Sequence, residues 1–123
     1  MRVSWDIDRA NRRLYTRHTG RIGFAEIAEI LADSARHGTL HFQLLADATE
    51  AVFDLLPTDA QRFMELLAQM GKESSLGQTA VVTSGDTANG IIHMLAQLAA
   101  GFCSIAAFND HVDAERWLGW RIP

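Results

Sequence analysis

Three apolar runs in the sequence each end abruptly in side chains that can bind ligands or transfer protons. The carboxyl ends of parallel strands meet at one edge, where open α/β sheets bind their ligands, so these side chains could form the rim of a polar pocket. They are also the residue types that cap helices and close turns, and we favour that interpretation for the second and third groups. The residues that follow the three runs are Asp47, Thr49 and Glu50; Ser84 and Asp86; Asn109 and Asp110.

Asp47 and Glu50 are the strongest candidates for chemistry, because neither is an obvious cap for the next expected helix, which begins near Thr58. Two carboxylates could share the acid and base roles of a hydrolase. That reaction needs a deep cleft, and a chain of 123 residues with one core leaves little wall for it. The sequence also lacks the His-Glu-x-x-His, Gly-x-Ser-x-Gly and glycine-rich phosphate-loop motifs. We therefore predict that the protein is not an enzyme and uses no metal or other cofactor.

The five histidines show no metal-ligand spacing, but His93 belongs to a polar line on an otherwise apolar helix. Asn89, His93 and Gln97 recur every four residues, so they stack on one helical face. The simpler interpretation is the exposed face that every helix on a sheet has. The functional alternative is a binding groove between this helix and a neighbour.

The same helix carries more apolar residues than one buried face needs, and a second apolar face must be covered by something. The simplest cover is the C-terminal segment that contains Trp117 and Trp120. The second possible cover is the partner subunit of a homodimer, which would form either through the helix from Ile91 to Leu98 or through the two tryptophans. The third possible cover is a small lipid-like ligand. The apolar residues are Ile91, Ile92, Met94, Leu95, Leu98 and Ala99.

Composition favours one globular domain over residues 1–123, because 48% of the residues are hydrophobic and the length fits one core. The net charge of -4 gives no basic field to attract nucleic acid. A single cysteine, Cys103, excludes an internal disulfide and a cysteine-built zinc site. The sequence has no secretory apolar run at its start, and its longest apolar run is interrupted by polar residues and glycine. We therefore expect no membrane span and a cytoplasmic location.

The period of the hydrophobic pattern changes in an order that predicts the fold class. Two alternating strands form an antiparallel hairpin, and three rounds of helix followed by an apolar strand come next, with a short helix last. We expect an α/β fold with a single mixed sheet and about four helices, in the order ββαβαβαβα. The expected strands cover 3–8, 14–19, 42–46, 79–83 and 103–108, and the expected helices cover about 24–37, 58–70 and 87–100, with a last helix after 110.

This order of elements, with its polar step after the first buried strand, resembles the anti-sigma-factor antagonist fold called STAS. The chain is most similar to stand-alone bacterial members of unassigned function. Members of the family place an Asp-Ser-Ser/Thr-Gly run at the start of the second helix, where a kinase phosphorylates the serine. Here the corresponding stretch is Asp54-Leu55-Leu56-Pro57-Thr58. Asp54 matches, leucines replace the hydroxyls and the glycine is absent, so Thr58 is the only hydroxyl within reach, and we favour a helix cap as its role.

From the resemblance and the absence of a catalytic motif, we predict that the protein is a regulatory module that binds a protein partner. We expect contacts through the strand-end loops from Asp47 to Thr58, with Asp47, Thr49, Glu50, Asp54 and Thr58 as candidate residues. His93 is a further candidate if the groove beside its helix exists. The alternative function is the binding or sensing of a small apolar, lipid-like ligand beside the same helix.

Overall fold

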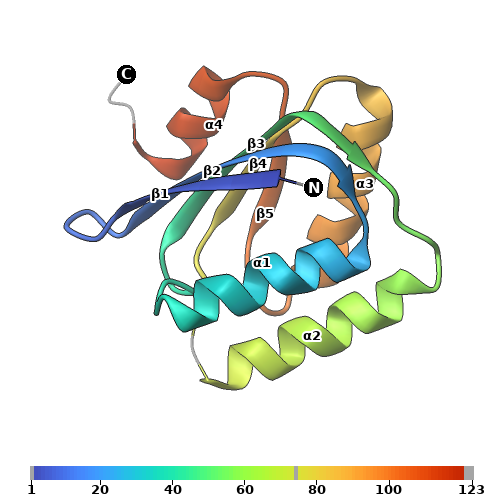
Figure 1. Ribbon diagram of the computed structural model, residues 1–123, viewed down its shortest axis with the longest axis horizontal. Helices are drawn as coiled ribbons and strands as arrows, with labels where there is room; N and C mark the ends of the chain where they lie inside the picture. The colour runs from blue at the N-terminus through green and yellow to red at the C-terminus, as the bar shows by residue number, and fades with distance from the viewer. Residues whose placement is uncertain (1, 74, 121–123) are drawn as a thin grey trace.

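The structure, a computed structural model, describes residues 2–73 and 75–120. One mixed sheet contains all five strands in the order β1-β2-β3-β4-β5 (Figure 1). β1 and β2 are antiparallel, and the remaining neighbours are parallel. This arrangement confirms the predicted mixed sheet and the order ββαβαβαβα. The strands are β1 (Arg2–Asp8), β2 (Arg13–Ile22), β3 (Gln43–Phe53), β4 (Thr79–Val82) and β5 (Ile105–Phe108).

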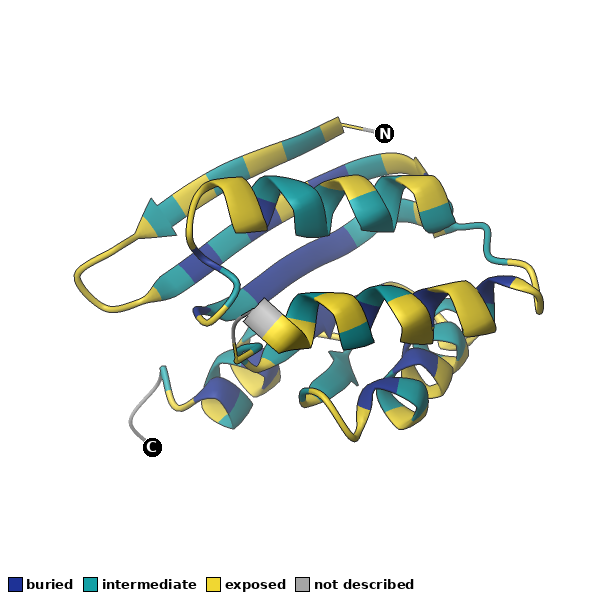
Figure 2. Cartoon of the chain, turned by 90° about the horizontal axis from the view of Figure 1, so that it is seen from below, coloured by how far each residue is buried: buried dark blue, intermediate teal, exposed yellow. Residues whose placement is uncertain are grey.

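The four helices divide between the two faces of the sheet. Successive strand residues point to opposite faces, so Ala46 contacts one group of helices and Leu45 the other. Ala46 belongs to the core under the first three helices, whereas Leu45 packs with Ala114 and Leu118 of the last. The buried middle of β3 lies behind α1 and α2 in Figure 2. The helices are α1 (Phe24–Arg36), α2 (Asp59–Glu73), α3 (Asp86–Ala99) and α4 (His111–Leu118).

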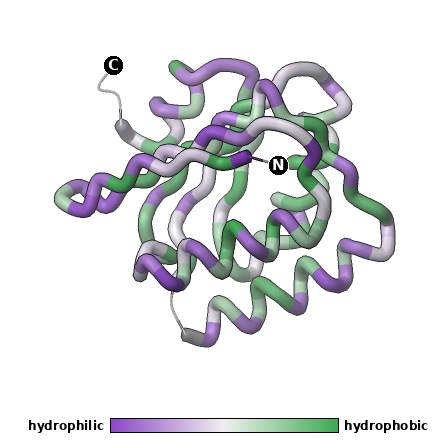
Figure 3. The backbone as a smooth tube through the Cα atoms, viewed as in Figure 1, coloured by the Kyte–Doolittle hydropathy of each residue, from purple (hydrophilic) through white to green (hydrophobic). Residues whose placement is uncertain are grey.

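Local sequence explains where two of the helices begin and end. The Glu26 carboxylate accepts a hydrogen bond of 2.8 Å from the Gly23 amide at the start of α1. Gly38 follows this helix with a φ of 69°, the left-handed conformation that favours glycine. Asp110 accepts from the Asp113 amide at 2.8 Å, which confirms its expected role as a cap, and it begins α4. Hydrophilic residues dominate the hairpin turn between β1 and β2 (Figure 3).

β3 is longer than predicted, so the change from apolar to polar residues at Asp47 lies inside the strand and not at its end. The expected strand ended at residue 46, but β3 continues to Phe53 and includes Asp47, Thr49 and Glu50. The extension forms because β2 also continues, to Ile22, and pairs with it. The register shifts once, so that one residue of β2, His18, lies opposite two residues of β3, Ala48 and Thr49. This bulge keeps the apolar residues on both sides of it facing the same core.

The other differences concern α2 and α3. α2 begins at Asp59 and continues two residues beyond Gly71, which was expected to end it. The predicted cover of α3 by the C-terminal segment is wrong. Trp117 and Trp120 pack with Leu45 and Val82 on the opposite face of the sheet. α3 is covered instead by the sheet and by α2.

Candidate functional site

Asp47 is the centre of a polar cluster between β2, β3 and the first turn of α4. Its side chain is only 8% exposed, and both of its carboxylate oxygens have partners. One oxygen accepts from the amide and the hydroxyl of Thr49, at 3.0 and 2.7 Å. The other lies 3.1 Å from Nε2 of His111 and accepts from the Tyr15 hydroxyl at 3.4 Å. We call Tyr15, Asp47, Thr49 and His111 the Asp47 cluster.

Electrostatics favour an ionised Asp47 beside a neutral Tyr15. Burial alone would raise the pKa of Asp47, but the two Thr49 hydrogen bonds and the charges of His111 and Arg17 lower it below its usual value. Burial and the charge of Asp47 raise the pKa of Tyr15. The cluster therefore holds one carboxylate beside a neutral phenol. His111 is more open than Asp47, with 41% of its side chain exposed.

Tyr15 and His111 were not among the predicted site residues. A signal for Tyr15 exists in the alternation of β2, which places it on the face opposite Leu14 and Thr16. Asp47 opposes Arg17 across the β2–β3 pair, two residues along from Tyr15 and on the same face. His111 follows the capping residue of a helix, so it could have been expected near the carboxyl edge of the sheet.

The predicted rim residues beyond Asp47 mainly connect loops. The Ser84 hydroxyl donates to the Thr49 carbonyl at 2.9 Å. The Asn89 amide donates to the Asn109 side chain at 2.7 Å, and Thr83 donates to the same Asn89. Asp86 is exposed in the first turn of α3. These contacts agree with structural roles at this edge of the sheet.

The carboxylates of Asp47 and Glu50 do not form a shared site. Glu50 is exposed, and the shallow depression that it lines together with Thr49 and Ser84 does not include Asp47. The carboxyl oxygens of Asp47 are already engaged by neighbouring side chains and an amide. This geometry supports no hydrolytic pair.

The segment between β3 and α2 contains the other two candidates. Asp54 forms an ion pair with Arg21 of β2. Thr58 is exposed, and the side-chain hydrogen bond in the turn before α2 belongs to Asp59, whose carboxylate accepts from the Leu56 amide at 2.7 Å. Leu56 itself is 61% exposed, and Val52 at the end of β3 is 67% exposed.

His93 lies on the outer side of α3. It is exposed, as is Gln97, while Asn89 is half-buried and bonded to the adjoining loops. Ile92 and Leu95 face the core instead. The polar line is therefore the solvent side of the helix.

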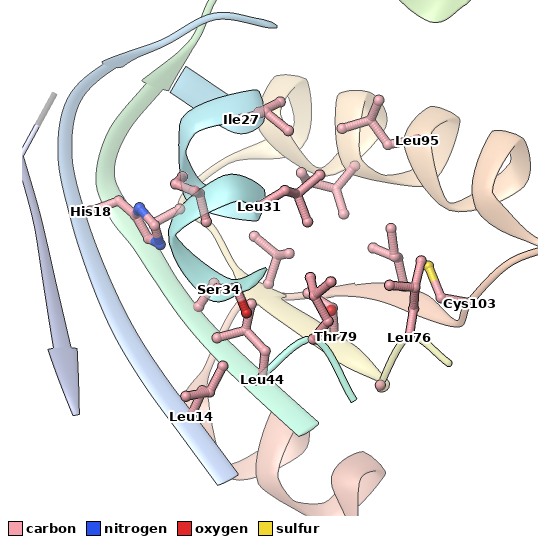
Figure 4. A pocket seen from close by; sticks show the side chains of 18 of the residues that line it. Leu14, His18, Ile27, Leu31, Ser34, Leu44, Leu76, Thr79, Leu95 and Cys103 are labelled. Atoms are coloured by element: carbon pink, nitrogen blue, oxygen red, sulfur yellow. The ribbon is translucent and has the colours of Figure 1, made fainter. Parts of the chain in front are cut away.

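A cavity of about 170 Å³ lies on the opposite face from the Asp47 cluster, between the sheet and the three helices α1, α2 and α3. Figure 4 shows side chains from the sheet and from α1 and α3 pointing into it. Its wall is mainly hydrocarbon, including Leu14, Ile27, Leu31, Leu44, Leu76 and Leu95.

Polar atoms in the cavity wall are few. The Ser34 and Thr39 hydroxyls bond to each other at 2.7 Å. His18 is buried, and its Nε2 lies 2.8 Å from the Thr16 hydroxyl. Its other ring nitrogen, Nδ1, has no hydrogen-bond partner among the described residues. Cys103 also lines the cavity, and burial raises the pKa of its thiol, so the thiolate is disfavoured.

Within residues 2–73 and 75–120, no three His, Cys, Asp or Glu side chains lie close enough to hold a metal ion together. No helix there has both the length and the apolar character that a membrane crossing requires.

The sequence matches no protein-family model and no curated protein. The solved structures that are similar to this chain include the following two. An uncharacterized protein of the DUF3478 family from Shewanella loihica PV-4, with a SpoIIAA-like fold, is 20% identical with a TM-score of 0.57, over 94% of this chain and 93% of that one. The anti-sigma factor antagonist SpoIIAA in its unphosphorylated form is 7% identical with a TM-score of 0.56, over 98% of this chain and 100% of that one. The chain therefore has a STAS-like fold, as the order of its elements predicted.

Proposed function

We propose that the protein is a cytoplasmic regulatory module that binds a protein partner and performs no catalysis of its own. Its contact surface is the segment from the end of β3 to the start of α2, with Val52, Asp54, Leu56 and Thr58. The fold supports this proposal, because the similar SpoIIAA is an anti-sigma factor antagonist. The exposed apolar side chains of Val52 and Leu56 are the observation that carries it.

The segment presents these apolar side chains from a fixed backbone. Asp54 is paired with Arg21, and the Leu56 amide is bonded to Asp59. A held segment loses little conformational entropy when a partner binds it. A leucine that is 61% exposed gains from burial against an apolar surface. We therefore expect a partner with an apolar contact patch.

Binding through this surface does not depend on a phosphorylation switch in our proposal. Leucines occupy the positions that correspond to the family's hydroxyls, and Thr58 is the hydroxyl that remains. Mass spectrometry of the protein from growing cells should find Thr58 unmodified. A stoichiometric phosphate on Thr58 would contradict this part of the proposal.

A charge placed on the surface tests the proposal. Leu56→Asp should remove a partner that wild type captures reproducibly from cell extract in quantitative affinity purification. Val112→Asp is the matched control, because Val112 is a similarly apolar, partly exposed residue on α4. Loss of the same protein in both variants, or in neither, would contradict this contact surface.

We further propose a second candidate, the binding of a small apolar ligand, which the cavity of about 170 Å³ favours. The cavity lies mainly under α1 and reaches α3 through Ile92 and Leu95, so it extends the site that was expected beside that helix. Native mass spectrometry of freshly purified protein should reveal a bound small molecule that denaturation releases. Protein that is always ligand-free, and that takes up no benzene when benzene is added, would contradict this candidate.

A further inference from the structure

His18 brings an unsatisfied polar atom to a mainly apolar cavity. The residue is 4% exposed, and its ring lies between β2 and α1 in Figure 4. Nε2 is engaged by Thr16 at 2.8 Å, whereas Nδ1 is buried without a partner among the described residues. A buried polar nitrogen without a hydrogen bond costs free energy, so the site favours any occupant that supplies one.

The chemistry of the wall limits what that occupant can be. Of the described residues that line the cavity, none is Lys, Arg, Asp or Glu. An ionised ligand would be buried without a countercharge, which is strongly unfavourable. Burial lowers the pKa of His18, although the nearby Asp47 opposes this, and the ring is therefore neutral at pH 7. The polar group of the ligand must be neutral as well.

A neutral imidazole leaves two possibilities for Nδ1. If Nε2 donates to the Thr16 hydroxyl, Nδ1 is an acceptor, and if Nε2 accepts from it, Nδ1 donates. A hydroxyl group can both donate and accept, so it satisfies Nδ1 in either tautomer. A single water is a poor alternative, because buried waters make about three hydrogen bonds and Nδ1 offers one.

The volume limits the size of the apolar part. An engineered apolar cavity of about 150 Å³ binds benzene. The cavity here is slightly larger, at about 170 Å³, and its wall is also mainly aliphatic and aromatic carbon. A six-membered ring with one small substituent fits this space, and a long lipid chain does not.

We propose that the cavity binds a benzene-sized apolar molecule carrying one hydroxyl group, which hydrogen-bonds to Nδ1 of His18. This inference rests on the second candidate function and adds the chemical class and the polar anchor of the ligand. Phenol is the simplest molecule of this class, and benzene is the matching molecule without the hydroxyl. A cavity without a polar anchor would favour benzene, because the buried phenol hydroxyl would lack a partner.

Calorimetric titration of phenol and benzene into wild type and His18→Phe tests the anchor. We expect wild type to bind both, and His18→Phe to lose on the order of tenfold in phenol affinity while benzene affinity changes little. His93→Phe, the same substitution at an exposed histidine, should leave both affinities unchanged. Equal losses for the two probes, or no loss for phenol, would overturn the anchor and leave the second candidate function intact. Failure of wild type to bind either probe would overturn both.

A second measurement uses the wild-type protein and does not depend on the folding of a variant. Nitrogen chemical shifts of the His18 ring report hydrogen bonding at each nitrogen separately. Saturating phenol should shift the Nδ1 resonance, and benzene at the same occupancy should leave it near its ligand-free position. An Nδ1 resonance that responds equally to both probes would overturn the hydrogen bond that we propose.

Discussion

At the scale of single residues, Asp47 and His18 are two buried polar side chains on the β2–β3 pair that differ in how far their polar atoms are hydrogen-bonded. Asp47 has a partner for each carboxylate oxygen, which compensates the cost of its burial. Among the described residues, His18 has a hydrogen-bond partner for one ring nitrogen only. The two residues lie on opposite faces of the sheet, because one points toward α4 and the other toward α1. The first arrangement is complete in itself, whereas the second is completed by a ligand in our proposal.

The ionisation of Tyr15 tests the electrostatics of the Asp47 cluster. Tyr15 is the only tyrosine in the chain, so the ultraviolet absorbance change of tyrosinate reports on it alone. Burial and the Asp47 charge should place the pKa of Tyr15 above the ordinary 10.0. Asp47→Asn should lower this pKa relative to wild type, and Glu50→Gln, at an exposed carboxylate, should not change it. An ordinary Tyr15 titration in wild type would contradict the cluster as described.

The pH dependence of stability separates His18 from Asp47. The pKa of His18 is lowered by burial, so below about pH 6.5 the unfolded chain binds a proton that the folded chain does not. The free energy of unfolding should therefore fall as the pH drops below about 6.5. The pKa of Asp47 is also lowered, and its contribution is present above about pH 3.8 and lost as the pH falls through the folded value.

Urea unfolding across this pH range measures both effects. His18→Phe should flatten the decline that begins below about pH 6.5, whereas Asp47→Asn should retain that decline and lose part of the one in stronger acid. Asp47→Asn should also cost about 1–2 kcal/mol at pH 7, because charge-assisted hydrogen bonds are weakened. Unchanged slopes in both variants would show that neither group titrates as the geometry requires.

Single residues could be predicted from the sequence only when their neighbours in the chain carried the signal. Asp47 follows an apolar run, and this change of polarity identifies it without a structure. His18 and Tyr15 lie in an alternating strand, where the pattern separates the two faces but does not reveal which face is covered. His111 meets Asp47 through a contact between residues 64 positions apart. Such contacts depend on strand register and helix placement, which local patterns do not contain.

At the scale of elements, the bulge in β3 explains how a polar strand extension keeps its apolar side in the core. Ala46 precedes the bulge and Ala48 lies in it, and Ala51 and Phe53 follow at an odd spacing from Ala48. All four pack against the same core, although strict alternation would turn the second pair away. The predicted strand ended at residue 46, where the apolar run gives way to polar residues, and the bulge breaks the alternation beyond that point. Order and type of the elements were predictable, whereas this boundary required the pairing with β2.

Gly77, in the segment before β4, and Gly90, in α3, should respond in opposite ways to substitution by alanine. A methyl group at Gly77 would overlap the Phe42 carbonyl, and the Gly77 amide also donates to Leu40 at 2.9 Å. Gly77→Ala should therefore lower the free energy of unfolding by roughly 2–4 kcal/mol. Gly90 lies inside α3 with open space around the added methyl, so Gly90→Ala should raise it by about 0.5–1 kcal/mol. Chemical denaturation of both variants measures the pair, and effects of the same sign would contradict the packing around residues 40–42 and 77.

At the scale of the whole molecule, the sheet separates two kinds of site. The face under α1, α2 and α3 contains the cavity, and the face under α4 contains the Asp47 cluster. The surface proposed for a protein partner lies where β3 leaves the sheet for α2. Phe53 packs against the core next to this exit and also lines the cavity. A ligand in the cavity and a partner on the surface would therefore contact neighbouring residues of β3.

The homodimer remains a prediction. Its two candidate surfaces are the helix from Ile91 to Leu98 and the pair Trp117 and Trp120, and the outer side of α3 is the more accessible of the two in the structure. The Trp120 indole donates to Gln43 at 2.8 Å, and Arg13 lies over its ring. Trp117 packs against Phe108. On the outer side of α3, His93 and Gln97 are exposed and make no such contact with the described part of the chain, and Met94 beside them is 39% exposed.

The strength of such a dimer follows from the area that α3 can offer. Stable interfaces bury about 800 Å² on each partner, more than a tenth of the 6968 Å² that this chain exposes. A helix of 14 residues is about 21 Å long, and one largely polar strip along it supplies only part of that area. We therefore expect sedimentation velocity to find monomers at low micromolar concentration, with dimers only at roughly a hundredfold more. Met94→Glu should abolish those dimers and Val112→Glu should preserve them, whereas a dimer stable at nanomolar concentration would show that a larger surface than α3 is involved.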